Sequence, residues 1–195
     1  MKLLKGYKPM NLGEQIRQKY FEMIDSNFVF KGCTDVEIDK VKEFQNITYI
    51  PQSYRDLLQV MGHRGLSRIA MGESDWNLLE KVKADFIGMM QLQRMSYPRD
   101  LLIFHNDLET FYFCRTRDQI DNPAVYGYSN GWIVEGAVQP GMAKLAERLS
   151  DFWLMLIDAY RNLTEGGIGN WKPLAQIHYD SNLDEYLIDG QAYSK

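Results

Sequence analysis

Apolar residues recur at helical spacing in four stretches of the first half of the chain. An apolar residue at every third or fourth position places a stripe along one side of a helix. The stripes predict helices that start near Asn11, Thr34, Pro51 and Ser74. Asn11 and Thr34 are each followed three residues later by a glutamate, which is the capping-box pattern of a helix start.

The third of these helices carries a signal at both ends. Pro51 suits a first helical position, where its missing N–H is not needed. Gly62 follows the last apolar residue of the stripe, where a left-handed C-terminal cap is expected. The stretch from Gly62 to Gly72 is rich in glycine and predicts a loop, after which Ser74 is expected to cap the fourth helix.

The pattern changes after Pro98 to short apolar and aromatic runs, which favour strands. We predict strands at 101–105, 110–115, 124–128 and 132–135, with turns at 105–109 and 129–131. The connections are short, so neighbouring strands should be antiparallel.

Helical spacing returns from Met142 to Tyr160, over about five turns, after Pro140 and Gly141 close the sheet region. The order of elements predicts the α+β class: N-terminal helices, a mainly antiparallel sheet of four or more strands, and a long C-terminal helix packed on it. We expect one domain over residues 1–195, with an N-terminal helical extension at 1–33 and a C-terminal tail at 165–195.

Composition narrows the classes of function. The chain has 26 acidic and 22 basic residues, a net charge of −4, which disfavours a dedicated nucleic-acid binder and suits a basic partner. Its apolar runs are too short for a signal-peptide core or a membrane span, so we expect a cytoplasmic protein with no nucleic acid or membrane as partner. Cys33 and Cys114 lack metal-type spacing and are expected to be reduced thiols. The oligomeric state stays open.

Few residues suggest a catalytic or metal-binding role. His105, Asp107 and Glu109 alternate as metal ligands on a strand would, but Asn106 and Asp107 also suit a turn, which we favour. Cys114 with His105 would give a thiol nucleophile and its base, yet a cysteine in an aromatic strand is more often a small buried apolar residue. We predict no catalytic residue, no metal site and no cofactor, and we expect His63 to be solvated without a partner.

Aromatic and arginine side chains crowd the predicted sheet. Such residues are favoured at protein interfaces, although packing in a core is the alternative. The candidate partner-binding residues are Asp107, Glu109, Tyr112, Arg115, Tyr126, Tyr128 and Trp132.

The same order of elements resembles the SUKH superfamily, the fold of the fungal Smi/Knr cell-wall-assembly regulators and of many bacterial proteins. The resemblance covers residues 34–160. The residues that carry it are Glu37, Val41 and Phe44, the segment 50–58, the acidic turn and strand at 107–115, the strand at 124–126 and the closing helix at 145–156. The loop from Gly62 to Gly65 departs from the Asn-Gly-Gly that the family often has there.

The resemblance implies a binding role, because the family has no enzymatic motif to transfer. Many bacterial members are immunity proteins that neutralise a cognate secreted toxin made by the same cell. We therefore expect a non-enzymatic protein-binding domain whose partner is a toxin domain. The alternatives are an intracellular regulatory scaffold of the Smi/Knr type, and a small hydrolase or thiol enzyme that uses His105, Asp107 and Cys114.

Overall fold

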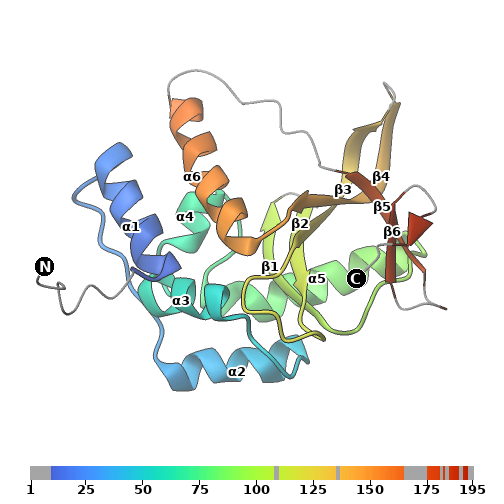
Figure 1. Ribbon diagram of the computed structural model, residues 1–195, viewed down its shortest axis with the longest axis horizontal. Helices are drawn as coiled ribbons and strands as arrows, with labels where there is room; N and C mark the ends of the chain where they lie inside the picture. The colour runs from blue at the N-terminus through green and yellow to red at the C-terminus, as the bar shows by residue number, and fades with distance from the viewer. Residues whose placement is uncertain are drawn as a thin grey trace, which may run out of the picture.

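The fold combines helices with one antiparallel sheet, which confirms the predicted α+β class (Figure 1). The computed structural model describes residues 10–107, 110–134, 137–164, 175–180, 182, 185–188 and 191–192. The helices in these ranges are α1 (Leu12–Met23), α2 (Asp35–Gln45), α3 (Gln52–Met61), α4 (Leu66–Ala70), α5 (Leu79–Leu92) and α6 (Leu149–Thr164), and a 3-10 turn, η1 (Trp76–Leu78), precedes α5. None of the helices in the described ranges is both long enough and apolar enough to cross a membrane.

The strands follow one another across the sheet in chain order, each antiparallel to the next. They are β1 (Leu101–Asp107), β2 (Thr110–Arg115), β3 (Val125–Val134), β4 (Ala137–Ala146), β5 (Ala175–Asp180), β6 (Glu185–Ile188) and β7 (Gln191–Ala192). Short connections join most of the consecutive strands of this meander, whereas α6 lies in the connection from β4 to β5.

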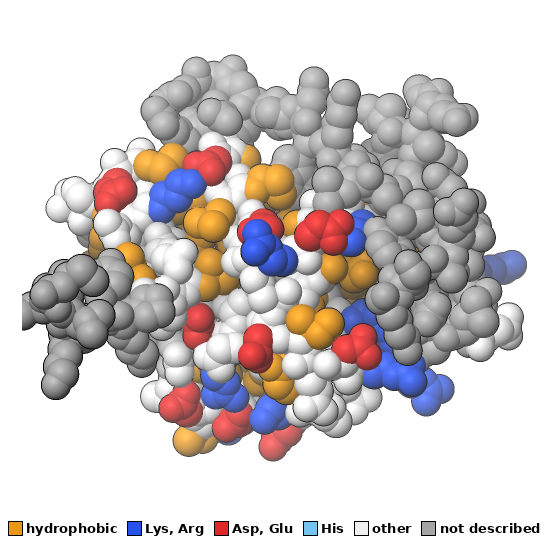
Figure 2. Space-filling model, viewed as in Figure 1, with side chains coloured by type: hydrophobic (Ala, Val, Ile, Leu, Met, Phe, Trp, Pro, Cys, Tyr) orange, Lys and Arg blue, Asp and Glu red, His pale blue; other side chains and the backbone are white. Residues whose placement is uncertain are grey.

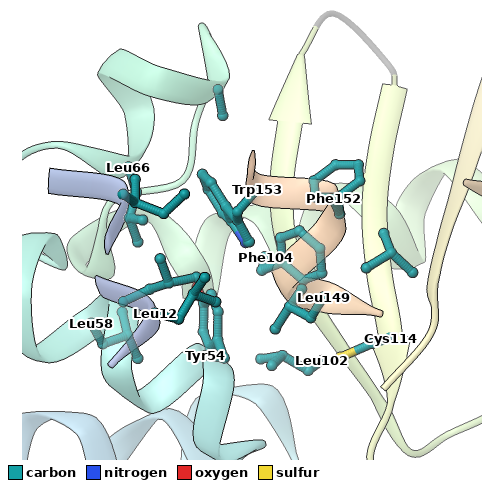
Figure 3. Packing of buried hydrophobic residues seen from close by; sticks show 14 of the residues in the cluster. Leu12, Tyr54, Leu58, Leu66, Leu102, Phe104, Cys114, Leu149, Phe152 and Trp153 are labelled. Carbon is teal, nitrogen blue, oxygen red and sulfur yellow. The ribbon is translucent and has the colours of Figure 1, made fainter. Parts of the chain in front are cut away.

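Helices cover both faces of the first strands. On one face, Phe86 of α5 packs against Phe111 and Phe113 of β2. On the other face, Phe104 of β1 contacts Tyr54 of α3 and lies in the same cluster as residues of α1, α4 and α6 (Figure 3). Because both faces are covered, β1 reads as a continuous apolar run rather than as an alternating strand.

The first two helix starts follow their sequence signals. The side chain of Asn11 accepts a hydrogen bond from the Glu14 amide at 2.9 Å. At α2, the Thr34 amide donates to the Glu37 carboxylate at 2.8 Å, and the Glu37 amide donates to the Thr34 hydroxyl at 3.3 Å. The predicted capping box is therefore complete, and it fixes the position of the Glu37 side chain.

Three residues predicted to start or end a helix have other roles in the structure. Pro51 precedes α3 as its capping residue, and the helix begins at Gln52. Gly62 is right-handed, with φ −64°, and the positive φ angles of this stretch belong to Gly65 and Met71. Ser74 does not cap α5, because its hydroxyl bonds to His105 at 2.6 Å, and α4 forms inside the predicted loop.

Two predicted strands and their turn form one strand, β3. Residues 129–131, which favoured a turn, lie inside it, at an irregularity in the pairing with β4 between Ser129 and Trp132. Pro140 lies in β4 opposite this irregularity, a position that tolerates a residue without an N–H donor. The turn predicted from His105 also begins later, since β1 continues to Asp107.

The predicted helix from Met142 is shorter than expected, because residues up to Ala146 belong to β4 and α6 begins at Leu149. Its position on the sheet is confirmed by Phe152, whose ring lies 5.1 Å from that of Tyr112 on β2. The predicted tail also contributes strands β5 to β7, and the rest of residues 165–195, apart from residue 182, lies outside the described ranges.

Candidate functional site

The predicted partner-binding aromatics are divided between the two faces of the sheet. Tyr112 faces α6 and stacks on His105, with ring centroids 4.6 Å apart. Tyr126 stacks on Phe113 at 6.1 Å on the α5 side, where Tyr128 is fully buried. These rings mainly pack the two cores.

The other predicted residues differ in exposure. Asp107 is exposed at the end of β1. Arg115 is half-buried and holds Asp100 through two contacts of 3.3 and 3.2 Å. Glu109 and the side chain of Trp132 lie outside the described part of the chain. Asp107 is therefore the predicted contact most accessible to a partner among those described.

His105 is a buried imidazole held by its neighbours. Its Nδ1 lies 2.6 Å from the Ser74 hydroxyl, and its Nε2 has no hydrogen-bond partner among the described residues. Burial lowers the pKa of His105 to about 3. The ring is therefore neutral at physiological pH and serves packing.

The residues of the enzyme alternative lie apart along the β1–β2 pair. Cys114 is opposite Leu102, whereas His105 is opposite Tyr112, so the thiol and the imidazole are three residues apart along β1. Burial raises the pKa of the Cys114 thiol, and a protonated thiol is a poor nucleophile. This geometry gives no support to a thiol enzyme built on these side chains.

A different constellation forms where the start of α2 meets the end of α3. The Cys33 sulfur, a carboxylate oxygen of Glu37 and a ring nitrogen of His63 all lie within 4.8 Å of one another. Backbone contacts bring them together: the Cys33 amide donates to Leu58 O at 2.8 Å, and the His63 amide donates to Lys31 O at 2.9 Å. We call Cys33, Glu37 and His63 the junction trio.

The ring of His63 is fixed by two contacts. Its Nε2 lies 2.9 Å from Glu37 Oε1, and it packs against the Trp76 ring in a T-shaped arrangement, with centroids 5.4 Å apart. The Trp76 indole N–H donates to the backbone carbonyl of Glu37 at 2.8 Å, so one tryptophan positions two members of the trio. The prediction that His63 is solvated without a partner was wrong.

Electrostatics differ sharply within the trio. Burial, followed by the nearby carboxylates of Glu37 and Asp75, raises the pKa of the Cys33 thiol to about 12. Hydrogen bonds from the Thr34 amide and hydroxyl, with a smaller contribution from His63, lower the pKa of Glu37 to about 2. At neutral pH the trio therefore pairs a protonated thiol with an ionised carboxylate.

The trio is not visible in the sequence, because its spacing is not local. Cys33 and Glu37 are four residues apart, but His63 follows only after a further helix. The available signal was Gly62: a Cβ on it would lie 2.5 Å from the Cys33 sulfur, so this glycine marks a close approach rather than a left-handed cap.

Carboxylates also gather at one end of the molecule. The backbone of Glu73 pairs with that of Asn106, through N···O distances of 2.8 and 3.1 Å. This pairing brings the loop before α5 to the end of β1. Lys81 of α5 lies 2.7 Å from Glu73 and 2.8 Å from Asp85. We call this surface the acidic end, and it consists of Met71, Glu73, Lys81, Asp85 and Asp107.

No protein-family model matches this sequence, and no curated protein matches it at a significant level. The resemblance to the SUKH superfamily therefore stays a prediction that rests on the residues named above. The fold itself assembles two constellations that could bind a ligand or a partner, the junction trio and the acidic end.

Proposed function

We propose that the protein is a non-enzymatic protein-binding domain that neutralises a cognate toxin, and that the partner docks on the acidic end. One observation carries the location of this surface. Carboxylates from three separate elements lie near one another: Glu73 and Asp85 both pair with Lys81, and Asp107 follows Asn106, whose backbone pairs with that of Glu73. The toxin role comes from the SUKH resemblance.

The charges of the acidic end suit a basic partner. Three carboxylates and one ammonium leave a net negative surface, which speeds the encounter with a positive partner and fixes its orientation. A toxin that acts on nucleic acid is expected to carry such positive charge. Met71, which is 51% exposed, supplies an apolar contact of a type that is enriched at interfaces.

The surface over α2 is less suited to such a partner. Arg55 lies 2.7 Å from Asp39 and 3.5 Å from Asp35, and Lys42 lies 3.3 Å from Asp39. Figure 2 shows acidic and basic side chains interspersed over this helix. Mutual neutralisation weakens the field that a partner would meet there.

The proposal is tested with the product of the gene upstream of this one, expressed as the candidate toxin. We expect a complex whose association slows as salt is raised. The Asp85→Lys, Asp107→Lys double variant should associate about tenfold more slowly at low salt, because the steering charge is reversed. It should also lose protection of cells that express the toxin.

A matched control carries the same change in net charge elsewhere. The Glu22→Lys, Glu43→Lys double variant alters exposed acids on α1 and α2, and it should bind and protect like the unaltered chain. Equal losses for both double variants would remove the acidic end as the contact surface. Absence of any complex and of any protection would instead reject toxin neutralisation.

A further inference from the structure

We propose that the junction trio is a binding site for a thiophilic divalent cation, with Zn²⁺ the best match. The donors are one sulfur, one imidazole nitrogen and one carboxylate oxygen. Zn²⁺ accepts all three donor types, whereas Ca²⁺ and Mg²⁺ prefer oxygen donors alone. The site is independent of the acidic end.

The distances are close to those that a tetrahedral ion requires. Bonds of about 2.3 Å to sulfur and about 2.0–2.1 Å to nitrogen and oxygen place the ligand atoms roughly 3.3–3.7 Å apart. Glu37 Oε1 and His63 Nε2, now 2.9 Å apart, would separate slightly as the ion replaces their shared proton. All the ligand atoms already lie within 4.8 Å of one another, so side-chain rotation suffices.

The surroundings hold each ligand in place. Thr34 anchors the Glu37 carboxylate through two contacts of 2.8 Å, and Trp76 holds the His63 ring. Gly62 leaves room for the Cys33 sulfur, since any Cβ there would lie 2.5 Å from it. Residues such as Thr34 and Trp76, which hold the ligands without binding the ion themselves, orient those ligands and raise the affinity for metal.

The local charge favours a cation over a free thiolate. The carboxylates of Glu37 and Asp75 and the ammonium of Lys31 act on the Cys33 sulfur. Two negative charges against one positive charge disfavour a bare thiolate but attract a dication, which offsets the charge of a thiolate ligand.

The ion would link two segments of the fold. Cys33 precedes α2, Glu37 lies in its first turn, and His63 follows α3, so coordination would fasten these elements together. Three protein ligands leave one coordination position for water. Binding to the folded chain alone raises its thermal stability, which gives a readout independent of any activity.

The test is a Co²⁺ titration of the reduced full-length chain, followed by Zn²⁺ displacement. We expect one equivalent of Co²⁺ to give tetrahedral visible bands and a near-ultraviolet thiolate-to-cobalt charge-transfer band, and Zn²⁺ to abolish both. Cys33→Ser should remove the charge-transfer band. It should also weaken Zn²⁺ binding by roughly 100-fold or more, since loss of an outer partner alone weakens binding about 10–100-fold.

Two further variants keep the test decisive if Cys33→Ser fails to fold. Glu37→Gln removes a ligand but keeps the capping box, because glutamine serves equally at that position. It should weaken Zn²⁺ binding and abolish the metal-induced rise in melting temperature. Cys114→Ser, on β2, should leave both unchanged. Absence of the charge-transfer band, or Zn²⁺ affinity equal in the unaltered chain and Glu37→Gln, would overturn the site.

Discussion

His63 at the junction and His105 in the β1–β2 hairpin occupy opposite kinds of environment. His63 is half-buried, lies 2.9 Å from an ionised carboxylate and is close to a thiol. His105 is 1% exposed, bonds to a neutral hydroxyl and stacks on a tyrosine. Both are held in place, but only His63 is accompanied by other groups that could bind a ligand.

The difference shows how burial separates a structural histidine from a functional candidate. A fully buried imidazole without a charged partner is kept neutral by the cost of desolvating its cation. A half-buried imidazole beside a carboxylate retains access to solvent and to ions. We therefore expect the hairpin to be sensitive to changes in packing, and the junction to be sensitive to close backbone approach and to metal.

The largest effect is expected from Gly32→Ala at the junction. A Cβ at this position would lie 1.7 Å from the backbone oxygen of Gln59, so the segment before α2 must move away from α3. Overpacking of this kind costs about 3 kcal/mol, and it should also separate Cys33 from His63. Chemical denaturation and Co²⁺ binding measure the two losses. An unchanged stability would mean that close approach does not hold the junction.

The next largest loss of stability is expected from His105→Ala, and comparison with His63→Ala tests the difference between the two histidines directly. His105→Ala leaves a cavity and removes the partner of the buried Ser74 hydroxyl, so the free energy of unfolding should fall by about 2–3 kcal/mol. His63→Ala should cause a clearly smaller fall, since water can replace its contacts. Urea denaturation of both variants checks the order. A larger loss for His63→Ala would reverse the comparison.

A smaller effect is expected from acid. The folded pKa of His105 is about 3, below the unfolded value of about 6.5. Between these values the unfolded chain binds the proton more readily, so stability is present above pH 6.5 and is lost as pH falls. As the pH falls from 7 to 5.5, protonation linked to His105 should lower the free energy of unfolding by about 1 kcal/mol.

The acid effect is isolated by two matched variants. His105→Gln should flatten this part of the stability profile, because it removes the buried imidazole. His63→Gln keeps that imidazole and should keep the slope. Urea denaturation at several pH values measures it, and equal slopes in the unaltered chain and His105→Gln would assign the acid sensitivity to other groups.

Local signals predicted those parts of the fold that local interactions determine. The Thr34–Glu37 box, the apolar stripe of α5 and the bounds of β2 are visible in sequence because capping, helical spacing and aromatic runs act over a few residues. Met142, Leu145 and Ala146 were misassigned because their spacing fits a helix as well as a strand. Pairing with β3 and β5 decided for the strand.

The junction trio was out of reach for the same physical reason. Cys33 and His63 meet through backbone contacts between the segment at Lys31 and the end of α3, and no repeat or spacing in the sequence encodes that contact. His105 and Asp107 drew attention because they are two residues apart in sequence, as alternating ligands on a strand would be. The strand irregularity between Ile103 and His105 instead gave His105 a buried position beside Tyr112.

The smallest effect is expected from Gly88→Ala on α5, the helix that covers the sheet on the face away from the junction. A Cβ at Gly88 meets nothing within 4 Å, and the position is exposed within the helix. Alanine restricts the unfolded chain and favours the helix, so stability should rise by about 0.5–1 kcal/mol. Thermal unfolding measures the gain, and Co²⁺ binding should stay unchanged. Gly32→Ala makes the same chemical change, a methyl group in place of a hydrogen atom. Comparison of the two variants therefore shows whether crowding at the junction causes the loss of stability. A loss of stability from Gly88→Ala would mean that α5 is as tightly constrained as the junction, and the contrast between the two regions would then fail.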